Sequence, residues 1–296
     1  MHRTFNLPGC FLFILYAQLF IFADQISAAV LTCKTPEGKT FFTDDPRKCG
    51  KQLVSEVNLD IPKQTRVNYR YPERQYDKVE SRWPIYIERP EKESDKQLYN
   101  KAIARLEKTL DLVFASFPPH SHAQLKTVTY YIMRGPKASL GGEDAILRYA
   151  GHNRTKKYSL HDKRWNNAVI IYNVENYLVI TNTWNKKTIT HELSHAWHHL
   201  KWGYEYQPIM DAWLNSRNSG LYQAVKNNEG RILKPAYAST DNMEYFAELS
   251  AIYFVGGVYH PFNKSGLKTY DPTGYAMIQK HWLVTEDALT KNLTRQ

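Results

Sequence analysis

The segment ITHELSHAWHHL at residues 189–200 constrains the fold of this chain more than any other feature. It holds four of the eleven histidines in a sequence of 296 residues. On an α-helix, His191 and His195 lie one turn apart and only about 40° apart around the axis, so both imidazoles can reach one zinc ion. Apolar residues interleave with the polar positions. We therefore expect His191 and His195 to be metal ligands on a partly buried helix.

Glu192 lies between the two histidines, beside their common face. Its side chain is poorly placed to be a ligand, but it can reach a water molecule on the metal. The pattern H-E-x-x-H is typical of the metal-binding helix of zinc metallopeptidases. The alternative is a surface helix with scattered histidines.

Two further histidines follow on the same segment. Reaching His198 from His191 requires a climb of about 10.5 Å along the helix, so one ion could bind both only on a strained helix. The longer pattern H-E-x-x-H-x-x-G-x-x-H is absent, since residue 198 is histidine and residue 201 is lysine. We expect His198 and His199 to support the site from behind or to face solvent.

The third ligand must come from another segment. Residues 241–254 read DNMEYFAELSAIYF, in which Glu244 and Glu248 share one face of a predicted helix. Buried carboxylates in an apolar helix need a partner of opposite charge, which suggests that one of the two glutamates binds the metal. The alternative is that both are ordinary surface carboxylates. Spacing alone does not choose between the two glutamates.

Residues 94–285 resemble the lethal-factor-type zinc metallopeptidases, a branch of the glutamate-zincins. The resemblance rests on H-E-x-x-H and on Glu244-Tyr245-Phe246-Ala247-Glu248, which matches the family pattern E-F-F-A-E except at Tyr245. It implies an α+β, zincin-like metallopeptidase domain with a mixed sheet and an active-site helix. It also implies Zn²⁺ bound by His191, His195 and Glu244.

The same resemblance implies roles for three residues around the metal. Glu248 would support a ligand histidine from behind. Tyr237, seven residues before Glu244, would stabilise the transition state. Glu192 would be the base that activates the attacking water on the zinc.

The N-terminus has the features of a secretory signal peptide. An apolar run, FLFILYAQLFIFA at residues 11–23, precedes the small residues Ser27-Ala28-Ala29. We expect cleavage after residues 1–29 and a secreted or periplasmic protein of the bacterial envelope. An uncleaved anchor is the alternative, but the run is short for a span of about 20 residues. We expect no membrane span after cleavage.

Residues 30–60 are predicted to form a small β-hairpin module. Removal of the signal takes Cys10 away and leaves Cys33 and Cys49, which we expect to form a disulfide. The chain-entropy model gives such a bridge about 3 kcal/mol. The pattern from Cys33 to Cys49 resembles a small domain of unknown function that follows signal peptides in many bacterial envelope proteins.

The remaining segments follow simple patterns. Residues 61–93, rich in proline and charge, are predicted to be a linker, and residues 94–296 to be the main domain. An edge strand within 168–182 is expected to bind an extended peptide. We expect a helix from Ser94 to Pro118, strands at 125–133, 168–173 and 177–182, mostly loop at 134–165, and helices at 207–226, 241–255 and 271–283.

These patterns predict a secreted zinc metallopeptidase that acts on protein or peptide substrates. The net charge of +10 favours anionic partners, such as an anionic envelope polymer. Tyrosines and basic residues interleave within 63–78. One interpretation is a binding patch for such a polymer, and the alternative is a solvated connector. No motif for nucleic acid is present, so we expect no nucleic-acid partner. Two other functions stay open: an inert zincin-fold binding protein, and a zinc hydrolase acting on a non-protein envelope substrate.

Overall fold

The computed structural model describes residues 31–34, 40–43, 53–55, 71–151 and 162–284. The chain divides into two compact units, Met1–Pro62 and Lys63–Gln296. The described residues are of mixed α+β class, with helices and a mixed sheet in the second unit. The predicted signal peptide lies outside the described residues.

In the first unit, the described strands form a small antiparallel sheet in the order β2-β1-β3. Leu31 pairs with Thr43, and Lys34 with Thr40, so β1 and β2 pair as the predicted hairpin requires. Cys49 lies outside the described residues, so the disulfide with Cys33 stays a prediction. The strands are β1 (Leu31–Lys34), β2 (Thr40–Thr43) and β3 (Leu53–Ser55).

The second unit is built on a mixed sheet whose described strands lie in the order β4-β5-β6-β8-β7. The three inner strands β5, β6 and β8 are parallel, while the outer strands β4 and β7 run antiparallel to their neighbours. The strands are β4 (Tyr76–Lys78), β5 (Ile85–Glu88), β6 (Thr129–Ile132), β7 (Leu147–Ala150) and β8 (Ala168–Ile171).

The linker predicted over residues 61–93 is wrong for 71–88, because β4 and β5 belong to this sheet. Its charges are partly buried: Arg74 is 1% exposed and pairs with the carboxylate of Glu88. Glu88 also accepts the backbone N–H of Arg134 at 2.7 Å, and the Arg134 Nε donates to Asp95 at 2.8 Å. The hydrogen bond from the backbone of Arg134 to Glu88 joins the segment to the rest of the domain.

Two segments differ from their expected secondary structure. Residues 177–182 are not a strand, since helix α5 spans Val174–Val179. The Asn173 side chain caps this helix by accepting the N–H of Glu175 at 3.0 Å, and Arg105 donates to the carbonyl of Leu178 at 2.7 Å. Conversely, the predicted loop at 134–165 contains β7, whose sequence LRYA lacks a clear alternation.

The remaining helices follow the predictions more closely. Predicted helices over 241–255 and 271–283 are present, while the one over 207–226 ends early, at Asn218. A short hairpin of β9 (Val225–Lys226) and β10 (Ile232–Leu233) follows. The helices are α2 (Glu93–Ser116), α3 (Pro119–Leu125), α6 (Asn182–Lys201), α7 (Gln207–Asn218), α8 (Asn242–Phe254), α9 (Lys264–Tyr270) and α10 (Pro272–His281).

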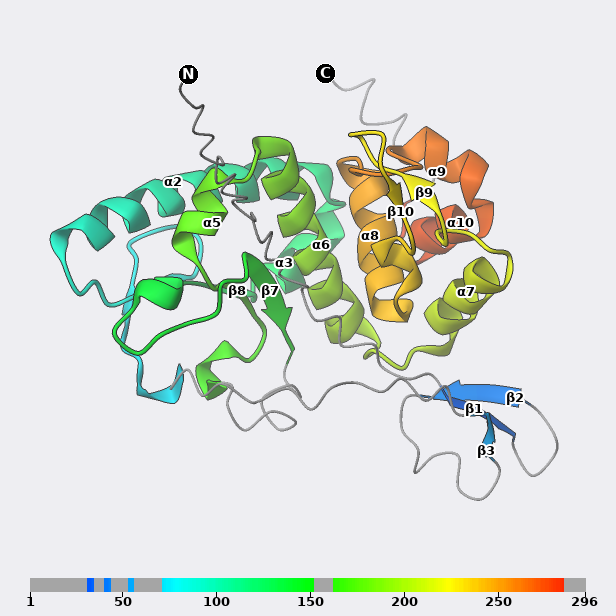
Figure 1. The fold of residues 1–296 in the computed structure, drawn as a ribbon, viewed down its shortest axis with the longest axis horizontal. Helices are drawn as coiled ribbons and strands as arrows, with labels where there is room; N and C mark the ends of the chain where they lie inside the picture. Colours follow the sequence, from blue (N-terminus) through cyan, green and yellow to red (C-terminus); the bar gives the residue numbers. More distant parts are fainter. Residues whose placement is uncertain (1–30, 35–39, 44–52, 56–70, 152–161, 285–296) are drawn as a thin grey trace, which may run out of the picture. The chain divides into compact units, whose positions relative to one another are not determined.

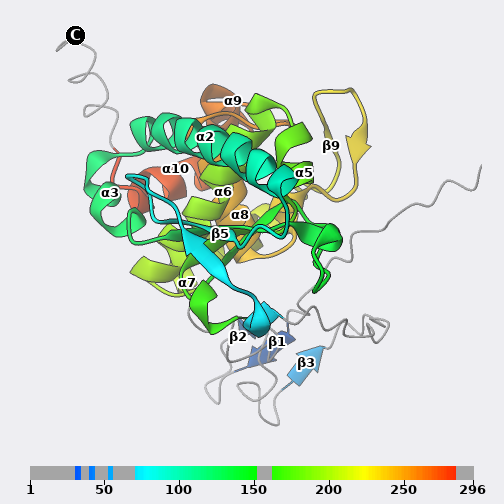
Figure 2. The ribbon, with the colours of Figure 1, turned by 90° about the vertical axis from the view of Figure 1, so that its left-hand side faces the viewer.

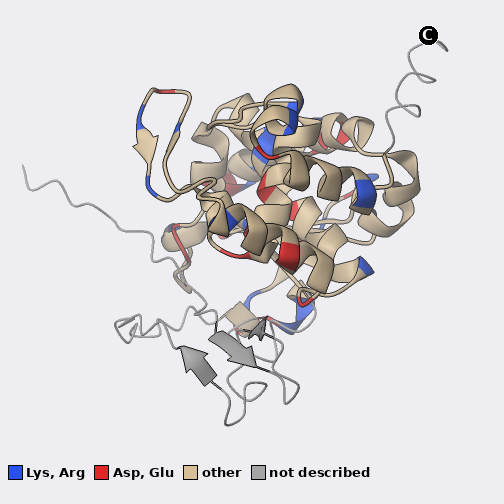
Figure 3. Ribbon diagram, turned by 90° about the vertical axis from the view of Figure 1, so that its right-hand side faces the viewer, with Lys and Arg blue, Asp and Glu red and all other residues tan. Residues whose placement is uncertain are grey.

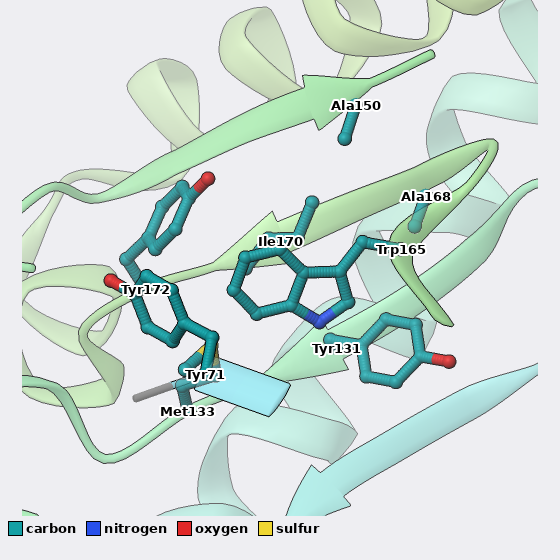
Figure 4. Packing of buried hydrophobic residues seen from close by; sticks show 8 residues of the cluster. All are labelled: Tyr71, Tyr131, Met133, Ala150, Trp165, Ala168, Ile170 and Tyr172. Atoms are coloured by element: carbon teal, nitrogen blue, oxygen red, sulfur yellow. The ribbon is translucent and has the colours of Figure 1, made fainter. Parts of the chain in front are cut away.

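Both faces of the sheet are covered, because all four residues of β8 are buried. On one face, Trp165 packs against Tyr71 and Tyr172, with ring centroids 4.7 and 5.9 Å apart. Figure 4 shows these rings above the strands. The buried members of this cluster are Tyr71, Tyr131, Met133, Ala150, Trp165, Ala168, Ile170 and Tyr172.

Helix α6 is the centre of the second unit. Figure 1 shows it between strands β7 and β8 on one side and helices α7–α10 on the other, and Figure 2 shows α2 crossing near it. The side chain of Asn185 on α6 donates to Thr109 on α2 at 2.7 Å. None of the helices in the described ranges is both long and apolar enough to cross a membrane.

Candidate metal centre

The two histidines are presented by α6, which starts after an N-cap. The Thr181 hydroxyl accepts the N–H of Trp184 at 3.2 Å, which satisfies one of the free donors of the first turn. His191 and His195 are 4% and 8% exposed. The sequence prediction of this helix is therefore confirmed, and its histidine face is largely buried.

Glu244 comes from the first turn of α8, which lies beside α6. The carboxylate of Asp241 caps α8 by accepting the N–H of Glu244 at 2.8 Å. Burial and the nearby charge of Glu244 raise the pKa of Asp241 to about 6. The cap fixes the start of α8 so that Glu244 points at the two histidines.

The three side chains meet in a nearly equilateral triangle of ligand atoms. The Nε2 atoms of His191 and His195 are 3.0 Å apart. An oxygen of Glu244 lies 3.0 Å from the His191 Nε2 and 3.2 Å from that of His195. A tetrahedral zinc ion separates its nitrogen and oxygen ligands by about 3.3 Å. These residues form a group that could hold a metal ion.

Glu248 lies behind His191, on the side away from Glu244. Its Oε1 atom is 2.7 Å from the His191 Nδ1. Burial alone would raise the pKa of Glu248, but the positive charge of Lys187 and the contact with His191 lower it to about 2. Spacing did not distinguish the two glutamates, and the structure places only Glu244 in the triangle.

His191 holds a proton strongly when no metal is present. Burial lowers the pKa of the imidazole, but its contacts with Glu244 and Glu248 outweigh burial and raise the pKa to about 10. Conversely, the charges of His195 and His191 outweigh burial at Glu244 and hold its pKa well below the ordinary value. The carboxylates of Glu244 and Glu248 thus make the site negatively charged, so that it stabilises a cation, either the proton on His191 or a metal ion.

Glu192 is fixed by the outermost strand of the described sheet. One of its carboxylate oxygens accepts the backbone N–H of Tyr149, on β7, at 2.6 Å. The Tyr149 hydroxyl donates to Asn167 at 2.9 Å, so β7 is itself anchored. Glu192 is 6% exposed, which limits its freedom to rotate.

Tyr237 lies against the ring of His191. It begins the short helix η4 (Tyr237–Ser239) before α8, and its ring stacks on that of His191 with centroids 5.8 Å apart. The residue is 43% exposed. Partial burial and the negative charges of Glu244 and Glu192 raise the pKa of its hydroxyl far above the ordinary value. The hydroxyl therefore stays a hydrogen-bond donor at neutral pH.

His198 and His199 lie outside the triangle. His198 is fully buried. The expectation that it faces solvent is therefore wrong. Its ring packs near Tyr204 and Phe246, with centroids 5.5 and 5.1 Å away, and burial lowers its pKa to about 3. His199 stacks on Tyr204. Both residues support α6 by packing.

Sequence reasoning missed two charged residues near the site. Lys187, four residues before His191, pairs with Glu248 and is only 7% exposed. The spacing of four on a helix already placed it on the histidine face, and this signal could have found it. Arg148 on β7 was missed because that segment was predicted to be loop.

Basic and acidic residues both occur along the helices and loops of the described part of the chain. In the view of Figure 3, Lys and Arg positions of the ribbon alternate with Asp and Glu positions. Of the basic and tyrosine-rich stretch at 63–78, Arg74 and Tyr71 are buried, so this part is no solvated basic face. An anionic envelope polymer as partner stays a prediction that rests on net charge.

Comparison with protein-family models finds no matching family, and comparison with curated proteins finds no match. The case for function therefore rests on the geometry of the site.

Proposed function

We propose that the chain is a secreted zinc-dependent peptidase of the zincin type. The observation that carries the proposal is the triangle formed by His191, His195 and Glu244, with atom separations of 3.0–3.2 Å. Two imidazoles and one carboxylate are a ligand set of catalytic zinc, because they leave a coordination position open. Imidazole nitrogen also favours zinc over magnesium or calcium.

In this proposal, residues beside the triangle assist peptide hydrolysis. Zinc held there would polarise a substrate carbonyl and lower the pKa of water. Glu192, fixed by the N–H of Tyr149 at 2.6 Å, takes the proton of the attacking water and passes it to the leaving amine. The Tyr237 hydroxyl donates a hydrogen bond to the oxyanion that forms.

We also propose that residues 1–29 direct export and that the substrate is an extended peptide. The expected edge strand within 168–182 is wrong, because β8 is an inner strand and 174–179 is helical. The outer strand beside Glu192 is β7, and it takes over this role in the proposal.

The test is hydrolysis of unfolded casein by zinc-loaded protein lacking residues 1–29. We expect cleavage that a chelator abolishes and added zinc restores. Glu192→Gln should keep its zinc and lose about 10²–10⁴-fold in kcat/KM, because general-base catalysis contributes that much. Zinc-loaded protein that cleaves no peptide would contradict the proposal and favour a binding protein or a hydrolase of another bond.

A further inference from the structure

Arg148 is a charged residue at the site that the mechanism does not use. It lies on β7, directly before Tyr149, whose N–H binds the carboxylate of Glu192 at 2.6 Å. Its guanidinium lies over the ring of Tyr172, 5.9 Å from the centroid. Arg148 is therefore one residue along the strand from the group that fixes the proposed base.

Within the described ranges the Arg148 guanidinium makes no ion pair and no hydrogen bond, although it is half-buried. The carboxylates of Glu143 and Glu192 act on it only through their charge. By contrast, the buried guanidiniums of Arg74 and Arg134 both pair with carboxylates. A partly desolvated guanidinium without an anion is costly unless a ligand supplies one. Burial lowers the pKa of the guanidinium, but its electrostatic interactions with Tyr172, Glu143 and Glu192 outweigh burial and raise the pKa, so it stays charged.

Strand geometry puts Arg148 where a bound peptide would pass. Side chains alternate along a strand, so Tyr149 points to the α6 side, where its hydroxyl meets Asn167 and His199. Arg148 points to the opposite face, beside Tyr172 of the aromatic cluster. A peptide that adds to β7 as a further strand would place every second side chain on the face of this guanidinium, and one of them directly beside it.

We propose that Arg148 binds a carboxylate of the substrate, so that the site prefers peptides with an acidic group next to β7. This inference rests on the proposed function. The carboxylate can come from an Asp or Glu side chain within the peptide or from its C-terminus. A guanidinium suits either, because its planar fork matches a carboxylate with two parallel hydrogen bonds.

The test uses zinc-loaded protein lacking residues 1–29 and a library of acetylated peptides. One half has amidated ends and carries Asp or Asn at a single varied position, and the other half has a free or an amidated C-terminus. We expect about tenfold or higher kcat/KM for one carboxylate-bearing set over its neutral match, because a hydrogen-bonded charge pair contributes that much. Preference for internal Asp identifies the side chain as the source, and preference for free ends identifies the C-terminus.

Arg148→Gln should bring this ratio close to one, and Arg148→Glu should invert it. Arg82→Gln is the matched control, since Arg82 also lies over an aromatic ring, that of Trp83 at 5.8 Å, but next to β4 at the other end of the sheet. The control should keep the ratio of the parent. Equal cleavage of acidic and neutral peptides, or an undiminished ratio in Arg148→Gln, would overturn the inference.

A binding measurement separates this inference from the proposed function. In the Glu192→Gln background, the acidic peptide should bind about tenfold more tightly than its neutral match, and adding Arg148→Gln should remove the difference. If the parent cleaves nothing while this difference persists, the peptidase proposal fails and carboxylate binding by Arg148 stands. If the binding difference is absent, the inference fails even when peptides are cleaved.

Discussion

Lys187 is a buried cation that touches no proposed ligand, yet it acts on the site through Glu248. The pair is almost entirely desolvated, with side chains 9% and 0% exposed. In this setting the attraction between the charges compensates for their lost hydration, and removing one partner leaves the other uncompensated. Without Lys187, the carboxylate of Glu248 would either become protonated or have only His191 to compensate its charge.

Lys187→Met should therefore lower the free energy of unfolding of the metal-free protein by about 3–5 kcal/mol. Urea unfolding measures this change. Lys186→Met is the matched control on the neighbouring position and should change stability little. Adding Glu248→Gln to Lys187→Met should recover part of the loss, because the bare charge is removed. A loss below 1 kcal/mol for Lys187→Met would contradict the role of the pair.

The raised pKa of His191 predicts how zinc affinity depends on pH. In metal-free protein the pKa is about 10, above the ordinary value of about 6.5. The proton on His191 therefore stabilises the metal-free fold. This stabilisation is fully present when the pH is below the ordinary pKa of about 6.5, and it is lost as the pH rises through about 10. Zinc needs the neutral imidazole, so it must displace this proton at pH 7.

We expect zinc affinity to rise about tenfold per pH unit between pH 6.5 and 8.5, with about one proton released per zinc. Competition with a chelator gives the affinity, and calorimetry in two buffers of different ionisation enthalpy gives the proton count. An affinity independent of pH would show that His191 is already neutral without metal.

At the scale of elements, helices were easier to predict than strands. The helices that carry the triangle show through the spacing of His191 and His195, and of Glu244 and Glu248, while the caps Thr181 and Asp241 were seen only in the structure. The segment YLVITN at 177–182 was predicted to be a strand. Its structure is decided by the Asn173 cap and by the guanidinium of Arg105 on distant α2. Such a contact between remote segments leaves no local pattern.

Strand β7 shows the opposite failure. Its four residues, LRYA, have no hydrophobic alternation, because one side chain is the charged Arg148 and the strand lies at the end of the sheet. An outer strand needs apolar residues less than an inner one does. The residues of this strand that border the proposed base could therefore be found only from the structure.

At the scale of the whole molecule, the boundary of the main domain lies earlier than the sequence indicated. Prolines and charges between residues 61 and 93 suggested a linker, yet Ile85 is completely buried and Glu88 holds both Arg74 and Arg134. Composition could not distinguish solvated charges from charges that pair inside the fold. The two histidines of the triangle, by contrast, were readable from their helical spacing, whereas only the resemblance distinguished Glu244 from Glu248.

This boundary predicts the outcome of two truncations. A chain of residues 63–296 should unfold cooperatively with heat, since it contains all of the second unit. A chain of residues 94–296 lacks β4 and β5, leaves Arg134 without Glu88, and exposes one side of β6, so it should lose cooperative unfolding. Circular dichroism during heating measures both. Equal midpoints of thermal unfolding for the two chains would contradict this boundary and support the prediction that residues 63–93 are a linker.

The central claim is that His191, His195 and Glu244 bind one zinc ion, and the most direct test is metal content. The protein lacking residues 1–29 should hold about one zinc after reconstitution and dialysis, as expected for a three-ligand site. Glu244→Ala should lose most of it, while Glu229→Ala, at an exposed carboxylate in the β9–β10 hairpin, should keep it. A folded parent that stays free of zinc, or a Glu244→Ala variant that retains it, would contradict the account.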